Sequence, residues 1–196
     1  MQFGLSEEQT LLLDNVNRFL DDNSPLDRVR AYADGGDDAD IWAGLAELGV
    51  PALLIPEAQG GIGLNPLDAA IVAQSLGAHI TPSPFLGTAV MAPTALMASG
   101  GQYDDLLTEI AAGTHRVGIA FSEAIKRRND AQVEARDGAL FGKSLFAFDA
   151  DADSYLVADQ KQHLYLVAAD DPGLTRTHLT TVDKTRRTVE LTYDNA

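Results

Sequence analysis

The amino-acid sequence predicts an α+β protein, with an N-terminal all-α helical domain followed by a β-barrel-like or β-sandwich domain. Apolar residues recur at helical spacing from Leu5 to about Gly113. After His115 the period falls to two, among residues that favour strands. Helices that precede strands without alternating with them indicate two segregated parts. We therefore expect a helical domain over residues 1–114 and an incomplete β domain over residues 115–196.

The first helix has a clear start and a clear buried face. Ser6 and Gln9 have the spacing of a capping box, in which each side chain accepts from the other's main-chain amide. The residues that share one face of the helix are Leu12, Val16, Phe19 and Leu20. Further helices are expected from about Ile41 to Leu48, over 65–77, over 85–98 with a kink at Pro93, and over 103–112.

A glycine-rich stretch separates two of these helices, with glycine at positions 60, 61 and 63. Its spacing matches neither a phosphate-binding loop nor a dinucleotide-binding motif. A tight structural turn is the favoured interpretation.

Strands dominate the second part of the chain. Asp137-Gly138 is a strong hairpin signal, and residues 132–135 and 139–142 flank it with alternating patterns. Residues 154–158, 163–168 and 185–193 are rich in β-branched and aromatic side chains and predict further strands.

Composition excludes several classes of function. The chain has 29 acidic and 14 basic side chains and a net charge of −15, which argues against general nucleic-acid binding. It has no cysteine, and its four histidines lack metal-ligand spacing, so we expect no metal site. The N-terminus lacks the pattern of a signal peptide, and every apolar stretch is shorter than the ~18 residues of a membrane span. We expect a cytoplasmic protein with no membrane contact.

The residues alone show no self-contained catalytic constellation. Ser122 lacks the flanking glycines of a nucleophile elbow. Basic residues gather at 126–128 and at 184–187, where they form either solvated surface or an anchor for phosphate.

Several short motifs, taken together in their order, resemble the acyl-CoA dehydrogenases. The motifs are spread over nearly the whole chain, which makes the match specific. They are Leu5-Ser6-Glu7-Glu8-Gln9, Trp42 with Leu48-Gly49, Pro56-Glu57-x-x-Gly60-Gly61-x-Gly63, Ala120-Phe121-Ser122-Glu123, Asp137-Gly138 with Gly142-Lys143-Ser144, Ala150-Asp151-Ala152-Asp153 with Tyr155-Leu156-Val157-Ala158, and Asp183-x-Thr185-Arg186-Arg187.

The resemblance implies an FAD-dependent enzyme that removes the α and β hydrogens of an acyl-CoA thioester. It implies an electron-transfer acceptor protein and a homo- or hetero-oligomer. Family members carry the catalytic base in a C-terminal helical domain that we expect to be absent here. This chain would then supply part of the flavin and acyl-CoA site, contain no catalytic residue, and be inactive alone.

The same resemblance assigns flavin contacts to Phe121, Ser122, Leu145, Phe146 and Ala147. Counted from the lysine at 143, the family has tryptophan at the place of Leu145 and a hydroxyl near flavin N5 at the place of Ala147. Neither residue can do the same work, and a one-residue shift brings in Phe146 and the phenylalanine at 148 but still no hydroxyl.

The segment after Ser122 also departs from the family, which has a small-residue loop there that meets phosphate. A basic triplet stands in its place, and we expect Arg128 and Asn129 to contact the substrate.

The missing hydroxyl and the altered loop favour an alternative function, that of a non-catalytic dehydrogenase-like subunit that scaffolds a flavin-bearing partner. A third possibility is a globular acidic binding module unrelated to flavin.

Overall fold

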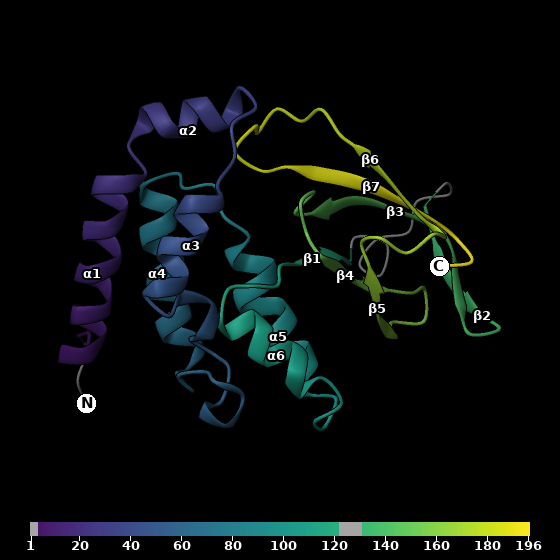
Figure 1. Cartoon of the computed structure of the whole chain (residues 1–196), viewed down its shortest axis with the longest axis horizontal. Helices are drawn as coiled ribbons and strands as arrows, with labels where there is room; N and C mark the ends of the chain where they lie inside the picture. Colours follow the sequence, from purple (N-terminus) through teal and green to yellow (C-terminus); the bar gives the residue numbers. More distant parts are fainter. Residues whose placement is uncertain (1–3, 122–130) are drawn as a thin grey trace. The chain divides into compact units, whose positions relative to one another are not determined.

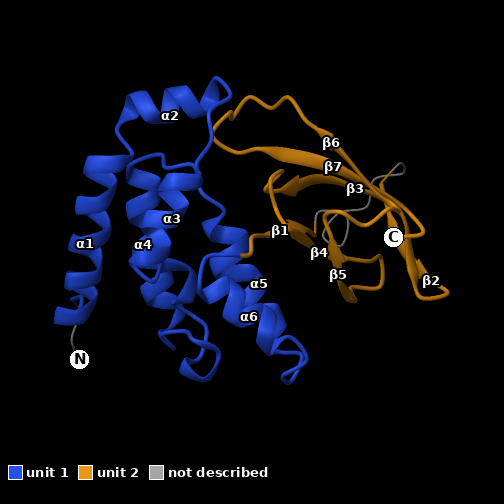
Figure 2. Cartoon of the chain, in the orientation of Figure 1, with its two compact units in different colours: residues 1–114 blue, residues 115–196 orange. Residues whose placement is uncertain are grey.

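The computed structural model describes residues 4–121 and 131–196. The chain divides into two compact units, residues 1–114 and 115–196 (Figure 2). In the described part of the chain, the helices lie in the first unit and the strands in the second, which confirms the predicted α+β class. Ser122, Arg128 and Asn129 lie outside the described residues.

The first unit is built from helices of modest length (Figure 1). They are α1 (Glu7–Asn23), α2 (Leu26–Ala33), α3 (Ala39–Glu47), the short η1 (Val50–Ala52) and η2 (Glu57–Gln59), α4 (Pro66–Ala78), η3 (Phe85–Met91), α5 (Ala92–Met97) and α6 (Asp104–Ala111). The predicted capping box begins α1, with Gln9 N donating to Ser6 Oγ at 3.1 Å and Ser6 N donating to Gln9 Oε1 at 3.0 Å. The sequence did not predict α2.

The segment 85–98 differs from the single kinked helix that the sequence predicts. Its first part, η3, is a π-helix, and α5 begins at Ala92. The two follow each other without a break, and Pro93 stands where the winding changes from π to α. Proline has no N–H to donate to the preceding turn, which suits such a change of winding.

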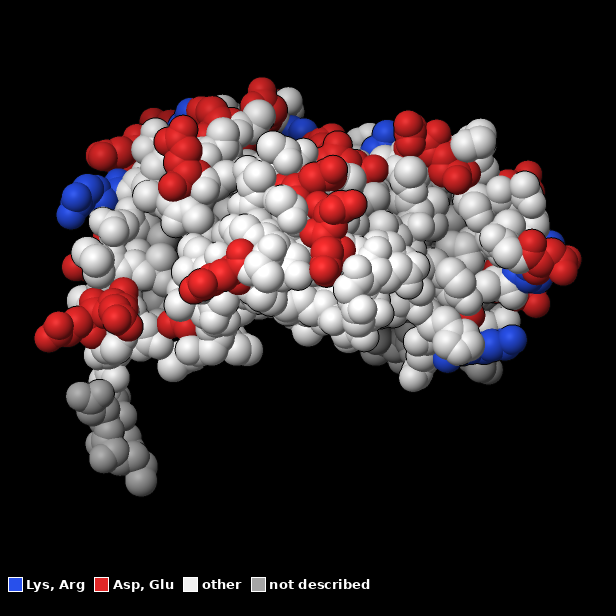
Figure 3. All heavy atoms as spheres, turned by 60° about the horizontal axis from the view of Figure 1, so that its bottom comes forward, with Lys and Arg blue, Asp and Glu red and all other residues white. Residues whose placement is uncertain are grey.

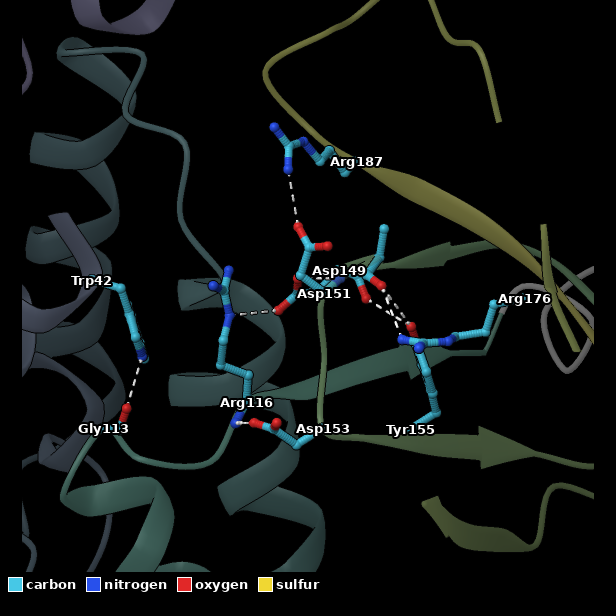
Figure 4. A network of polar contacts seen from close by, with 10 residues as sticks. Trp42, Gly113, Arg116, Asp149, Asp151, Asp153, Tyr155, Arg176 and Arg187 are labelled. Carbon is cyan, nitrogen blue, oxygen red and sulfur yellow. Dashed lines mark hydrogen bonds and ion pairs between the residues drawn. The ribbon is translucent and has the colours of Figure 1, made fainter. Parts of the chain in front are cut away.

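The core of the first unit gathers side chains from most of its helices. Trp42 belongs to this core and ties it to the end of the unit, because its indole Nε1–H donates to the carbonyl oxygen of Gly113 at 3.2 Å (Figure 4). The other core residues come from α1, α3, α4, η1 and η3 and include Val16, Leu20, Leu45, Val50, Leu53, Val72, Leu76 and Phe85.

The glycine-rich stretch wraps tightly around one main-chain segment. Gly61 N donates to Pro56 O at 3.0 Å, and Gly63 N donates to Ile55 O at 2.8 Å. A Cβ atom at position 61 would lie 1.8 Å from the carbonyl oxygen of Ile55. This geometry supports the interpretation of the stretch as a structural turn.

The second unit contains a seven-stranded sheet (Figure 1). The strands are β1 (Val117–Ala120), β2 (Val133–Arg136), β3 (Ala139–Phe148), β4 (Ser154–Ala158), β5 (Leu164–Ala168), β6 (Leu174–His178) and β7 (Thr188–Asp194). Their order is β5-β4-β1-β3-β7-β6, with β2 paired to β3, and only the β1–β4 pairing among those of the described strands is parallel. The predicted hairpin at 137–138 is confirmed by the pairing of Arg136 with Ala139. The sequence missed β1 and β6 and placed the start of β7 three residues early.

The sheet bends around its own core. Side chains from β1, β2, β3, β4, β5 and β7 share one cluster, which includes Val133, Leu140, Ala147, Tyr155, Val157, Val167, Val189, Leu191 and Tyr193. Gln160, just after β4, donates its amide to Val133 O on β2 at 3.0 Å, although β4 and β2 are not neighbours in the sheet order.

The turn between β4 and β5 is held by the buried carboxylate of Asp159. Its Oδ1 accepts from the amides of Lys161 and His163 at 2.8 Å each. Burial is the largest single influence and would raise the pKa of this carboxyl, but the two main-chain donors and the His163 side chain together lower it by more, so the pKa of Asp159 lies below its usual value.

Acidic side chains clearly prevail over basic ones on the surface drawn in Figure 3, as a net charge of −15 requires. Within residues 4–121 and 131–196, no helix has the length and apolar character needed to cross a membrane.

Candidate functional site

A β-bulge in β3 decides which of the predicted site residues face outward. Ser144 pairs with Leu191 and Ala147 with Val189, so Leu145 and Phe146 together oppose a single residue of β7. Phe146 has a φ of 56°, in the left-handed region, which is where one extra residue can be accommodated. The bulge resets the alternation of the strand, and Ser144 and Ala147 both point into the core.

The residues on the opposite face form what we name the outer strip: Leu145, Phe146 and Phe148 of β3, with Thr188 and Glu190 of β7. Phe146 is 48% exposed and Phe148 is 39% exposed, which is unusual for large aromatic side chains on a strand. Thr188 is the direct cross-strand partner of Phe148. The strip is therefore apolar in its middle and polar along β7.

Of the two polar side chains of the outer strip, one has a partner in the described part of the chain and the other has none. Glu190 is held by Lys143, whose Nζ lies 2.6 Å from its Oε1. Thr188 Oγ1 is buried and, within the described part of the chain, has no hydrogen-bond partner. The strip thus ends in a satisfied ion pair on one side and an unsatisfied hydroxyl on the other.

Three aspartates at every second position, Asp149, Asp151 and Asp153, hold the turn after Phe148 through contacts with arginines, which Figure 4 shows. Arg116 contacts two of them, with Nε 3.3 Å from Asp149 Oδ2 and its amide donating to Asp153 Oδ2 at 2.8 Å. Arg187 Nη1 lies 3.1 Å from Asp151 Oδ2. We name these five residues the aspartate staple. Because Phe148 precedes Asp149 and Thr188 follows Arg187, the staple fixes both strands where they enter the outer strip.

The main chain of this turn is also satisfied from within the unit. The Tyr155 hydroxyl donates to the carbonyl oxygens of Asp149 and Ala150 at 3.1 and 3.3 Å, and Arg176 Nη1 donates to Ala150 O at 3.3 Å (Figure 4). Burial raises the pKa of the Tyr155 phenol, and Arg176 opposes that shift by less. The phenol therefore stays protonated as a donor.

The structure describes four of the predicted site residues, Phe121, Leu145, Phe146 and Ala147, and places two of them on the outer strip. Leu145 and Phe146 lie on the outer strip, whereas the side chain of Ala147 lies in the core with no exposed area. Phe121 is half-buried and comes directly after β1. Ile119 pairs with Phe148 in antiparallel register, so the chain after β1 runs toward the bulge at Phe146.

These residues fit the ring system of a flavin. A planar apolar ring stacks well on exposed aromatic side chains, which Phe146 and Phe148 provide. A flavin also needs hydrogen bonds to its ring nitrogens and oxygens, and the unpartnered hydroxyl of Thr188 can supply one.

Sequence reasoning missed Thr188 and the aspartate staple. The spacing of Asp149, Asp151 and Asp153 is visible in the sequence, as is the arginine before Thr188. Which arginine contacts which aspartate depends on the order of the strands in the sheet, and the sequence pattern does not reveal that order.

Comparison with known proteins places the chain in a family. Residues 6–114 match the family described as acyl-CoA dehydrogenase, N-terminal domain. Acyl-CoA dehydrogenase IpdE2 of Mycobacterium tuberculosis is 40% identical over 111 residues, which cover 55% of this chain and 35% of that protein. The Mycolicibacterium smegmatis protein of the same name is 36% identical over 121 residues, which cover 60% of this chain and 38% of its own. The chain thus aligns with little more than a third of each curated relative.

Solved structures agree on the fold over nearly the whole chain. The ChsE4–ChsE5 complex of Mycobacterium tuberculosis matches with a TM-score of 0.87 and 23% identity, over 100% of this chain and 56% of that one. The Tcur3481–Tcur3483 steroid ACAD G363A variant matches with a TM-score of 0.84 and 26% identity, over 96% and 55%. Since the family match spans more than half of its residues, this chain belongs to the acyl-CoA dehydrogenase family, whose N-terminal domain it contains.

Proposed function

We propose that this chain forms the N-terminal domain (1–114) and the middle β domain (115–196) of an FAD-dependent acyl-CoA dehydrogenase. The reaction is the α,β-dehydrogenation of an acyl-CoA thioester. The observation that carries the proposal is the outer strip, where a bulge turns Phe146 and Phe148 outward to 48% and 39% exposure. Large exposed aromatic groups in one place mark a binding surface more often than chance.

In this proposal the residues of the chain bind and orient, and FAD, when bound, accepts the hydride from the β carbon. Phe146 and Phe148 exclude water from one face of the ring. The aspartate staple keeps Phe148 and Thr188 in fixed register beneath it. A site on paired strands is held more accurately than one on loops.

The base that removes the α proton is assigned to none of these 196 residues. Glu190 is the carboxylate of the outer strip, and Lys143 holds it as an ion pair at 2.6 Å. We expect no acyl-CoA oxidation by the isolated chain.

Partners follow from the relatives. The ChsE4–ChsE5 structure is a complex of two proteins, which supports a hetero-oligomer here, and a homo-oligomer is the simpler form of the same arrangement. A structure named for the electron transferring flavoprotein of Acidaminococcus fermentans, with a TM-score of 0.79 and 22% identity, supports an electron-transfer acceptor protein as a partner.

We place the assembly in the cytoplasm. CoA thioesters with steroid-derived acyl groups belong among the substrates to be tried, because one relative is named a steroid ACAD.

FAD titration of the purified chain tests the proposal. We expect the flavin absorption bands to remain with the protein after removal of excess FAD. Phe148→Ala should weaken binding, whereas Leu164→Ala should not, since Leu164 is a comparably exposed apolar residue (46%) on β5 at an edge of the sheet. Equal binding by the two variants would contradict the assignment of the outer strip.

A second candidate function is a non-catalytic, dehydrogenase-like subunit that scaffolds a flavin-bearing partner. It is favoured by Ala147, which stands where the family has a hydroxyl and whose side chain is buried in the core. A chain that stays colourless in the titration, yet restores activity to a flavin-bearing partner subunit, would support this candidate.

A further inference from the structure

The hydroxyl of Thr188 is not used by the fold. Its Oγ1 is buried and has no hydrogen-bond partner among residues 4–121 and 131–196. Two other hydroxyls of the unit are engaged, since Tyr155 donates to Asp149 O at 3.1 Å and Tyr193 donates to Ser144 Oγ at 3.2 Å. A buried hydroxyl without a partner destabilises a fold. Its place on the outer strip points to a partner that folding does not supply.

The register of the sheet puts this hydroxyl beside the aromatic residues. Thr188 pairs directly with Phe148, and cross-strand partners have Cβ atoms only about 4.5–5.5 Å apart. Val189 and Ala147, the next residues inward on the two strands, both lie in the core. Thr188 and Phe148 therefore share the outer face, and a ligand stacked on Phe148 has the Thr188 side chain next to it.

We infer that Thr188 donates a hydrogen bond to the polar edge of the flavin ring, in place of the hydroxyl that Ala147 lacks. The inference rests on the proposed function, because it takes FAD as the ligand of the outer strip. Thr188 is partly exposed as a residue, although its Oγ1 is buried. Rotation about its Cα–Cβ bond moves the hydroxyl between staggered positions and breaks no hydrogen bond in doing so.

Three variants of the 196-residue chain test the inference. Thr188→Val removes the hydroxyl and nearly keeps the shape, and Thr188→Ser keeps the hydroxyl. Thr192→Val is the matched control, because Thr192 lies on the same face of β7 but opposite Lys143, away from the phenylalanines. Each variant is titrated with FAD, its flavin absorption spectrum is recorded, and its ligand-free stability is measured by urea unfolding.

Loss of one neutral hydrogen bond predicts about 3- to 10-fold weaker FAD binding by Thr188→Val. We also expect a shifted flavin absorption band in that variant, and binding close to wild type in Thr188→Ser and Thr192→Val. Ligand-free Thr188→Val should be as stable as the wild-type chain or more stable, because it removes an unsatisfied buried hydroxyl.

The failures of the inference and of the proposed function are distinguishable. If Phe148→Ala loses FAD while Thr188→Val binds it like wild type, the inference is overturned and the proposed function stands. If ligand-free Thr188→Val is less stable than wild type, the hydroxyl serves the fold and the inference is again overturned. If the wild-type chain does not bind FAD, or Phe148→Ala binds it unchanged, both are overturned.

Discussion

Replacing Gly61 by alanine should destabilise the first unit more than any comparable change in the same loop. The new Cβ would stand 1.8 Å from Ile55 O, and real Cβ atoms essentially never come closer than 3.0 Å to such an atom. The two main-chain segments must therefore separate by more than about 1 Å, which breaks well-formed hydrogen bonds. Four amides of the loop donate across this contact, those of residues 61, 62, 63 and 64, at 3.0, 2.9, 2.8 and 2.7 Å.

The cost follows from those hydrogen bonds. At about 0.5–1.5 kcal/mol each, the loss of two or three of them lowers the free energy of unfolding by about 1–4.5 kcal/mol. Gly63→Ala is the control, because position 63 has open space around its Cβ and a φ of 69°. Alanine in that left-handed conformation costs about 1–2 kcal/mol.

Urea unfolding provides the assay. Trp42 is the one tryptophan of the chain and lies in the core of the same unit, so its fluorescence reports on this unfolding directly. The two variants and the wild type are compared under the same conditions. A Gly61→Ala variant as stable as Gly63→Ala would refute the argument, since it would show that the loop moves aside without losing its hydrogen bonds.

Three further predictions concern single polar contacts. Trp42→Phe removes the donor to Gly113 O and should lower the free energy of unfolding by about 1–3 kcal/mol. Unfolding is measured by circular dichroism, and an unchanged free energy would mean that the indole N–H contributes nothing. Tyr155→Phe keeps the ring, so it should lower stability by only about 0.5–1.5 kcal/mol in a thermal melt, and a larger loss would indicate that the turn after Phe148 had come apart. The pKa of Asp159 lies below its unfolded value of about 3.9, so its stabilising effect is full above that pH and lost as the pH falls through the folded pKa. Asp159→Asn should therefore flatten the dependence of stability on pH in that acidic range, and an unchanged slope would assign it to other carboxyls.

Local patterns predicted the local features of the fold. The capping box of α1 and the hairpin at 137–138 depend on residues three or four apart, and both are present as expected. The helical stretch predicted over 85–98 is present over 85–97, but its first part has π winding, which the sequence did not predict because Pro93 indicates only an irregularity and not its kind. Strand β6 was missed since its residues are mostly polar and exposed, which leaves no alternation to detect.

The candidate site was only partly predictable for a related reason. The family resemblance pointed to residues of β3, including Leu145 and Phe146, and their role in a flavin site stays a prediction. The bulge that turns Ala147 inward and the phenylalanines outward arises from the pairing of β3 with β7, whose sequences lie about forty residues apart. Thr188 joins the site through that pairing, so no window of the sequence contains the information. The expectations for Ser122, Arg128 and Asn129 stay predictions.

The parallel pairing of β1 with β4 has a consequence for synthesis on the ribosome. Val117 pairs with Ser154, and β1 lies between β3 and β4, both of which are made after it. At translation rates of about 5–20 residues per second, the growing chain carries β1 for roughly 2–7 s before Ser154 is made. All four residues of β1 are buried in the finished sheet, so during that time an apolar strand lacks its β4 partner. The residues of the helical unit up to Gly113 are all made before β1, so β1 is the first apolar strand of the sheet to wait for its partners.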